Sequence, residues 1–216
     1  MPCEAIAVQG VRLYRATAAG AGPPKLFVGG LHGDEGRYTA PILERLAQED
    51  VPTGEVIIVP QLTEQSTYIG VLNREYYQSE AGLRLLQLIQ RYQPRFYFEL
   101  HAYGPHSYAR LTDPERVQKI GVPHFIDLDE GILIGSIAPL LRLQFSARDF
   151  CMTIEVPNWK SEHERIRAKV LAVLRIGLTH TEREAVMQEF RMRYPAEVQE
   201  AEALFRQYYR DRLHPF

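Results

Sequence analysis

The chain has 216 residues, of which 45% are hydrophobic, so it is long enough to bury a full core. Its formal net charge of -2 and its dispersed Lys and Arg residues exclude a basic surface that would bind nucleic acid or an anionic membrane. No stretch reaches the roughly 20 apolar residues of a membrane span, and the first residues lack a secretory signal. We therefore expect a cytoplasmic protein that acts on a small molecule or a peptide, with Cys3 and Cys151 as ordinary reduced thiols.

Short apolar runs alternate with segments that suit helices. The runs predict strands at residues 25–28, 56–60, 96–100, 132–134 and 152–156. Helices are predicted at 38–49 and at 79–91, where apolar residues recur with a period near 3.6 until Pro94 ends the pattern. Strands that alternate with helices in this way are typical of a three-layer α/β/α domain.

The sequence from Ser161 onward is almost entirely helical and charged. Ser161 and Glu164 can cap a helix at its start, and a break near residues 178–181 precedes predicted helices at 182–194 and 196–213. We expect an α/β domain over residues 1–178. Residues 179–216 are expected to form a charged helical C-terminal extension, packed on that domain or on a partner subunit as a homo-oligomer.

A histidine and a glutamate lie three residues apart directly after the first predicted strand, in the stretch Gly-Gly-Leu-His32-Gly-Asp-Glu35-Gly. Ligand sites in α/β sheets gather where strands end at their carboxyl side, and the glycines allow the backbone to approach a ligand closely. His32 and Glu35 can therefore hold one divalent cation from the same side. Taken alone, the same residues also fit a glycine-rich turn with a capping glutamate.

The loop after the second predicted strand carries Asn73 and Arg74. An amide and a guanidinium side by side can bind a substrate carboxylate, the guanidinium through two parallel hydrogen bonds. On their own, an adjacent asparagine and arginine do not indicate a binding site.

The strand predicted at 96–100 runs into His101. This histidine is placed to join His32 and Glu35 as the third ligand of a catalytic zinc, which leaves the fourth tetrahedral position open. Glu99 lies two residues earlier, hence on the same side of the strand, and can hydrogen-bond that imidazole. The alternative for Glu99 is a salt-bridged carboxylate at the sheet edge.

Glu155 lies in the apolar run predicted as the last strand. An uncompensated carboxylate is costly to bury, so it should reach solvent or have a cationic partner. Beside a zinc ion such a carboxylate can serve as the general base that activates water. A salt bridge on an exposed face is the alternative.

The order of these motifs resembles the zinc carboxypeptidase superfamily, and most closely its succinylglutamate desuccinylase and aspartoacylase branch, over about residues 25 to 160. The resemblance implies a mixed, mostly parallel sheet of about eight strands between helical layers. It also implies one zinc ion held by His32, Glu35 and His101, a substrate carboxylate bound by Asn73 and Arg74, and Glu155 as the general base.

The chain departs from the family pattern in its arginines. Family members carry a further arginine shortly before the Asn-Arg pair, which polarises the scissile carbonyl, and no arginine lies between residues 51 and 72 here. A polarising cation would then come from elsewhere, with Arg110, Arg142 and Arg148 as candidates, or the metal alone would stabilise the oxyanion.

These features predict a zinc-dependent hydrolase that cleaves an amide bond next to a carboxylate, either an N-acyl amino acid deacylase or a carboxypeptidase-like enzyme. The competing hypothesis is a non-catalytic metal-binding or assembly protein that keeps the fold and the zinc site and works through its helical extension. Two imidazoles and one carboxylate also suit iron or manganese.

Overall fold

The computed structural model describes residues 3–8, 10–65, 67–210 and 216. Its strands are β1 (Glu4–Val8), β2 (Val11–Thr17), β3 (Lys25–Gly29), β4 (Glu55–Val59), β5 (Phe96–Tyr103), β6 (Ile126–Asp129), β7 (Ile132–Gly135) and β8 (Phe150–Pro157). The α-helices are α1 (Gly36–Leu46), α2 (Glu80–Tyr92), α3 (Tyr108–Leu111), α4 (Arg116–Ile120), α5 (Pro139–Arg142), α6 (Glu164–Thr179), α7 (Arg183–Arg193) and α8 (Pro195–Tyr209). Short 3-10 helices lie at η1 (Arg74–Gln78), η2 (Pro105–Ser107) and η3 (Asn158–Lys160).

The strands form one eight-stranded sheet in the order β1-β2-β4-β3-β5-β8-β7-β6. The central strands β4, β3, β5 and β8 run parallel, whereas β1 and β2 on one side and β7 and β6 on the other pair antiparallel. The mixed sheet expected from the motifs is confirmed, although its parallel part is narrower than "mostly parallel" because it is limited to these four strands.

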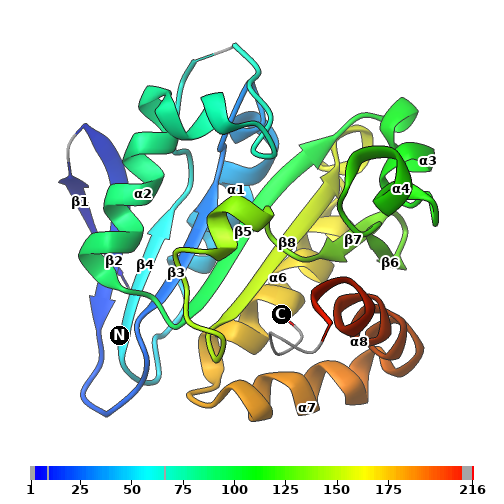
Figure 1. The fold of residues 1–216 in the computed structure, drawn as a ribbon. Helices are drawn as coiled ribbons and strands as arrows, with labels where there is room; N and C mark the ends of the chain where they lie inside the picture. Colours follow the sequence, from blue (N-terminus) through cyan, green and yellow to red (C-terminus); the bar gives the residue numbers. More distant parts are fainter. Residues whose placement is uncertain (1–2, 9, 66, 211–215) are drawn as a thin grey trace.

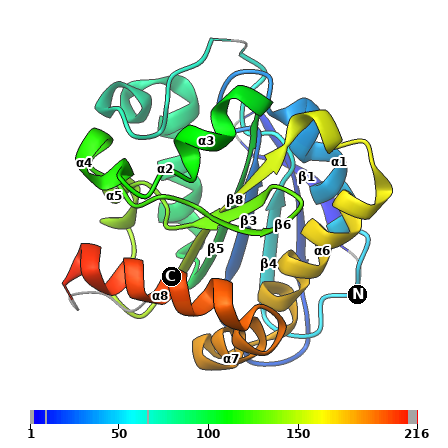
Figure 2. The ribbon, with the colours of Figure 1, turned by 90° about the vertical axis from the view of Figure 1, so that its right-hand side faces the viewer.

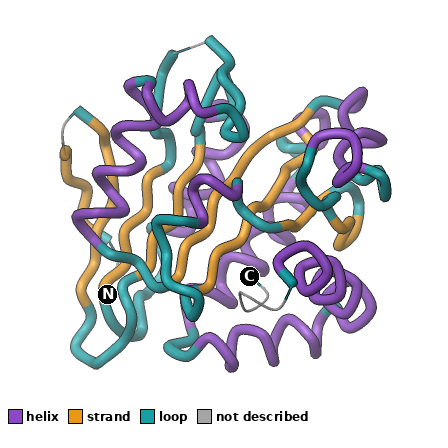
Figure 3. Tube along the Cα trace, viewed as in Figure 1, coloured by secondary structure: helices purple, strands orange, loops and turns teal. Residues whose placement is uncertain are grey.

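Helices cover both faces of the sheet (Figures 1 and 3). Buried residues of α1 and α6 form one hydrophobic core with one face, and those of α2 and α5 form a second core with the other. The side view in Figure 2 shows α6 running along the sheet. The parallel centre is therefore enclosed on both sides, as parallel sheets require.

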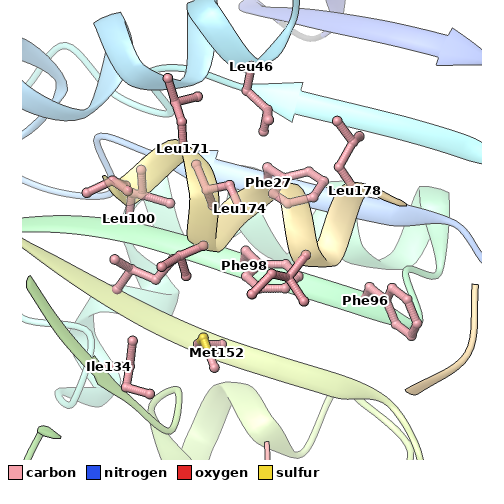
Figure 4. Close-up of a cluster of buried hydrophobic side chains, with 14 of the residues drawn as sticks. Phe27, Leu46, Phe96, Phe98, Leu100, Ile134, Met152, Leu171, Leu174 and Leu178 are labelled. Atoms are coloured by element: carbon pink, nitrogen blue, oxygen red, sulfur yellow. The ribbon is translucent and has the colours of Figure 1, made fainter. Parts of the chain in front are cut away.

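The first core contains aromatic rings on neighbouring strands, packed among aliphatic side chains (Figure 4). Phe27 of β3 stacks on Phe98 of β5 at 5.1 Å between ring centroids, and Leu171 and Leu174 of α6 are fully buried in the same cluster. Side chains alternate along each strand, so the residues of β5 next to Phe98, Glu99 among them, point to the opposite face.

Three strands, the three short helices α3, α4 and α5, and one helix cap differ from the sequence expectation. β1, β2 and β6 were not predicted, because β1 is largely exposed and β2 alternates buried with exposed residues around charged side chains. The cap predicted at Ser161 is wrong: His163 is the N-cap of α6 and makes no side-chain capping hydrogen bond. The hydroxyl of Ser161 donates to the carbonyl of Asn158 instead, at 2.9 Å.

The C-terminal helices α7 and α8 bury Val186, Phe190 and Val198 in the first core, and α8 also contacts β6. Residues 211–213 of the predicted last helix lie outside the described residues. The division of the chain at residue 178 stays a prediction. None of the helices in the described residues is long and apolar enough to cross a membrane.

Lys25 at the start of β3 is fully buried, and its ammonium donates to the carbonyl of Leu178 at the end of α6. Burial lowers the pKa of Lys25 to about 8. The unfolded chain then binds more protons than the folded one between pH 8 and 10.5, so this residue's contribution to the unfolding free energy rises with pH.

We expect the stability of wild type relative to Lys25→Met to increase by about 2 kcal/mol between pH 7 and 9.5. Urea denaturation of both proteins at the two pH values measures this difference. A constant or falling difference would contradict the lowered pKa. Lys169→Met, at an exposed ion pair with Asp129, is the control, for which no such rise is expected.

Candidate active site

The functional residues meet at one edge of the sheet. β3, β5 and β8 are parallel neighbours, so their carboxyl ends lie at the same edge (Figure 1). The segment after β3 carries His32 and Glu35, the end of β5 carries His101, and the end of β8 carries Glu155. This is the edge at which open α/β sheets bind ligands.

Two glycines determine the backbone conformation of the turn between β3 and α1. Gly30 and Gly33 adopt φ values of +58° and +59°, a region that side-chain-bearing residues rarely occupy. The hydroxyl of Tyr76 holds this turn by donating to the carbonyl of Leu31 at 3.1 Å. As a result His32 and Glu35, 5% and 7% exposed, turn back over the end of the sheet.

Three side chains converge there. The Oε2 atom of Glu35 lies 3.2 Å from Nδ1 of His101 and 3.4 Å from Nδ1 of His32. One ligand atom from each of the three residues lies within 4.8 Å of the others. The structure therefore brings together the three residues that the sequence predicts as ligands.

The other side of the His101 ring faces Glu99. Oε1 of Glu99 lies 3.4 Å from Nε2 of His101, while the hydroxyls of Thr153 and Tyr97 donate to the Glu99 carboxylate at 2.7 and 2.9 Å. Glu99 is 1% exposed, so the alternative of a carboxylate at the sheet edge is wrong. Instead, a buried carboxylate held by two hydroxyls lies at ion-pair distance from Nε2 of the imidazole.

The charges of this cluster favour a bound cation. Burial lowers the pKa of His101, but the carboxylates of Glu35 and Glu99 outweigh it, so the pKa lies well above the ordinary value. Burial, reinforced by the neighbouring His101, lowers the pKa of His32 to about 4, so His32 is neutral at pH 7. Two carboxylates that face one imidazolium leave a site with surplus negative charge, which a divalent ion would satisfy.

The donor set fits a metal on two further grounds. Nδ1 of His32 is buried without a hydrogen-bond partner among the described residues, which is costly unless a ligand completes it. In addition, the Nδ1-to-oxygen separations of 3.2 and 3.4 Å match the roughly 3.4 Å expected between atoms that are each about 2.1 Å from one tetrahedral zinc.

Glu155 is the register partner of His101 across the β5–β8 pair, so both side chains point to the same face of the sheet. It is partly buried and forms no ion pair in the part of the chain that the structure describes. Burial raises the pKa of the Glu155 carboxyl to about 7, and the nearby Glu35 carboxylate adds to the rise. A carboxyl whose pKa lies near neutrality can both accept and return a proton at physiological pH.

A cavity of about 560 Å³ opens over this cluster. His32, Glu35, His101 and Glu155 all line it, and Asn73 lines it from the loop before η1. Arg74 begins η1, is exposed, and lies outside the lining. The structure thus brings Asn73 to the cavity and leaves the Arg74 side chain beyond it.

Of the three arginines predicted as polarising cations, one lies at the cavity and two do not. Arg110 lines the cavity, whereas Arg142 and Arg148 do not, and Arg142 donates to the carbonyls of Ser146 and Asp149 instead. Arg116 of α4 also lines the cavity and is 9% exposed. Sequence reasoning missed Arg116, because the charged stretch around it reads as a surface helix.

Tyr68 was also missed. Its ring lies at 4.5 Å from that of His32, edge to face, and it lines the cavity although the side chain is 68% exposed. It follows no strand and lies in a polar loop, so its spacing carries no signal. Tyr68 forms a rim over the histidine cluster.

The comparisons with known proteins identify one family and one curated relative. The family model described as "Uncharacterized protein conserved in archaea (DUF2119)" matches residues 20–210. The "Uncharacterized protein MJ0501" of Methanocaldococcus jannaschii is 40% identical over 192 residues, which cover 88% of this chain and 93% of that protein.

Several solved structures are distantly similar to this chain. The product-bound ectoine utilization protein EutE of Ruegeria pomeroyi has a TM-score of 0.48 at 17% identity, covering 80% of this chain and 63% of its own. An aspartoacylase family protein from Mesorhizobium loti has a TM-score of 0.44 at 16% identity, covering 78% of this chain and 62% of its own. A metallo-carboxypeptidase from Pseudomonas aeruginosa has a TM-score of 0.46 at 12% identity, covering 85% of this chain and 61% of its own. The chain spans less than two thirds of the length of each of these three proteins.

Proposed function

The chain belongs to the family described as uncharacterized proteins conserved in archaea (DUF2119), and from its cavity we propose that it is a metal-dependent hydrolase of amide bonds next to a carboxylate. The observation that supports this most is the meeting of His32, Glu35 and His101 in one cavity with Glu155, the register partner of His101. Its substrate is proposed to be an N-acyl amino acid or the carboxyl end of a peptide.

His32, Glu35 and His101 would hold the ion, with zinc as the first choice for two imidazoles and a carboxylate. A zinc ion in such a site polarises a carbonyl and makes water more acidic. Glu99 would act through His101: its carboxylate, fixed by Thr153 and Tyr97 and 3.4 Å from Nε2 of the imidazole, would orient that ring when a metal is bound.

Glu155 would move the proton. As the water oxygen bonds to the carbonyl carbon, the Glu155 carboxylate takes a proton from the water and then gives it to the nitrogen as the C–N bond breaks. The products are a carboxylic acid and an amine. A carboxyl with a pKa of about 7 suits both transfers.

Asn73 and Arg74 would bind the substrate carboxylate. The Asn73 amide lines the cavity and can donate to a carboxylate inside it. Arg74 is exposed at the start of η1, so its guanidinium would act from the mouth of the cavity. This binding would place the scissile amide near Glu155.

Metal content and turnover together test the proposal. Protein purified without added metal, or reconstituted with zinc, is expected to hold about one divalent ion per chain and to hydrolyse members of a panel of N-acyl amino acids and C-terminal peptides. If the protein takes up no ion on reconstitution, the proposal is wrong. A protein that binds metal but turns over no member of the panel would favour the non-catalytic hypothesis.

A further inference from the structure

Arg116 is a buried cation on the wall of the cavity that the proposed reaction does not use. It begins α4, is 9% exposed, and lines the cavity together with Arg110 and Glu155. Its Nη1 donates to the carbonyl of Pro123 at 2.6 Å, and its guanidinium carbon lies 4.9 Å from the centroid of the Phe125 ring. These two contacts fix the side chain against the cavity wall.

Within the part of the chain that the structure describes, the Arg116 guanidinium lacks an anionic partner. No carboxylate of the described residues lies within ion-pair distance of Arg116, and its Nε is buried without a hydrogen-bond partner there. A buried charge is costly unless it is paired. Burial accordingly lowers the pKa of Arg116, and Glu155 is near enough to oppose that shift.

The surroundings favour an anion rather than a neutral ligand. Arg110 also lines the cavity and is exposed, and among the described residues its guanidinium donates only to the hydroxyl of Ser107, at 3.3 Å. Two positive side chains thus line the cavity, beside a cluster whose own carboxylates face the histidines. A planar guanidinium matches a carboxylate, which it can bind through two parallel hydrogen bonds.

We propose that Arg116 binds a carboxylate of the substrate inside the cavity, with Arg110 adding a second positive charge. This inference rests on the proposed function, since it assigns part of the substrate recognition of the same site. It makes Arg116 a specificity-determining residue and leaves Arg74 at the mouth with a smaller role.

Calorimetric titration tests the inference without turnover. The probe is succinate, succinamide is its uncharged counterpart, and inorganic phosphate is a second anion. The proteins are wild type, Arg116→Gln, Arg116→Lys, Arg74→Gln and the control Arg148→Gln, which changes an arginine outside the cavity. Their metal contents are matched, because a carboxylate can also contact a bound ion.

Wild type is expected to bind succinate and not succinamide. Arg116→Gln should weaken succinate binding about 10- to 100-fold, as expected for the loss of a charged hydrogen-bond pair. The succinate affinity of Arg116→Lys should lie between those of wild type and Arg116→Gln, because lysine keeps the positive charge but lacks the planar guanidinium. Arg148→Gln should bind as wild type does.

Several results would overturn the inference. These are the absence of succinate binding in wild type, a change below twofold in Arg116→Gln, and a loss that appears only in Arg74→Gln. Tighter binding of phosphate than of succinate would assign the site to phosphoryl groups. If Arg116→Gln fails to fold, Arg116→Lys decides, and unchanged affinity there rejects the role. A failed hydrolase would show instead as absent metal uptake or turnover, with succinate binding still dependent on Arg116.

Discussion

Replacement of His101 by alanine is expected to weaken zinc binding by more than about 100-fold, beyond the 10- to 100-fold that loss of an outer-shell partner costs. The reason is that His101 contributes one of three converging ligand atoms and is also the link between Glu35 and Glu99. Competition with a chromophoric chelator measures the affinity. Thr153→Val removes one of the hydroxyls that hold Glu99 and should give the smaller loss.

His124→Ala is the matched control. His124 has one nitrogen buried without a partner among the described residues, but it lies outside the ligand cluster and near Glu200 instead. Its loss should leave zinc affinity unchanged. His101→Ala also leaves two carboxylates without their cation, so the metal-free protein should be less stable. His32→Gln, which avoids this problem, should lose zinc as well, and retention of full affinity in both variants would reject the site.

The features that sequence could predict were those in which local pattern and position agree. β3, β5 and β8 are short, apolar and buried, and a polar residue at the end of such a strand has few structural uses. His101 and Glu155 stand out for that reason. β1 and β2 could not be recognised, because their stability comes from pairing along the sheet edge and charged residues interrupt their apolar pattern.

Arg74 and Arg116 show what the sequence could not supply. Adjacency to Asn73 predicts that the two side chains bind one substrate carboxylate, but neighbouring residues at a 3-10 turn point in different directions, and of the two Asn73 lines the cavity. Arg116 is buried because the segment around Phe125 folds back on it. Such burial depends on tertiary packing between segments whose own sequences are polar. The local hydrophobic pattern of either segment therefore does not predict it.

Glu155→Gln is expected to lower kcat roughly 100- to 10,000-fold, the range lost with a general base, while KM changes little. The substitution preserves the shape of the side chain and removes its ability to accept a proton. Glu155 is outside the ligand cluster, so the variant should retain its metal. Activity of both proteins on the best substrate of the panel, with metal content measured in parallel, gives the comparison, and exposed Glu162→Gln is the control.

The pH dependence and the stability of the Glu155 variant separate a base from a structural carboxylate. The base must be unprotonated, so wild-type kcat/KM should fall as pH drops below about 7, with the midpoint lower when a bound cation lowers the pKa. In the metal-free protein the raised pKa means that folded-state stability is lost as pH rises from 4.5 through 7. Above pH 7, the free energy of unfolding of Glu155→Gln should therefore exceed that of wild type by up to about 3 kcal/mol. Urea denaturation of both proteins measures this difference. A variant that loses stability and keeps activity would mean that Glu155 serves the fold, and that the proton is moved by another group.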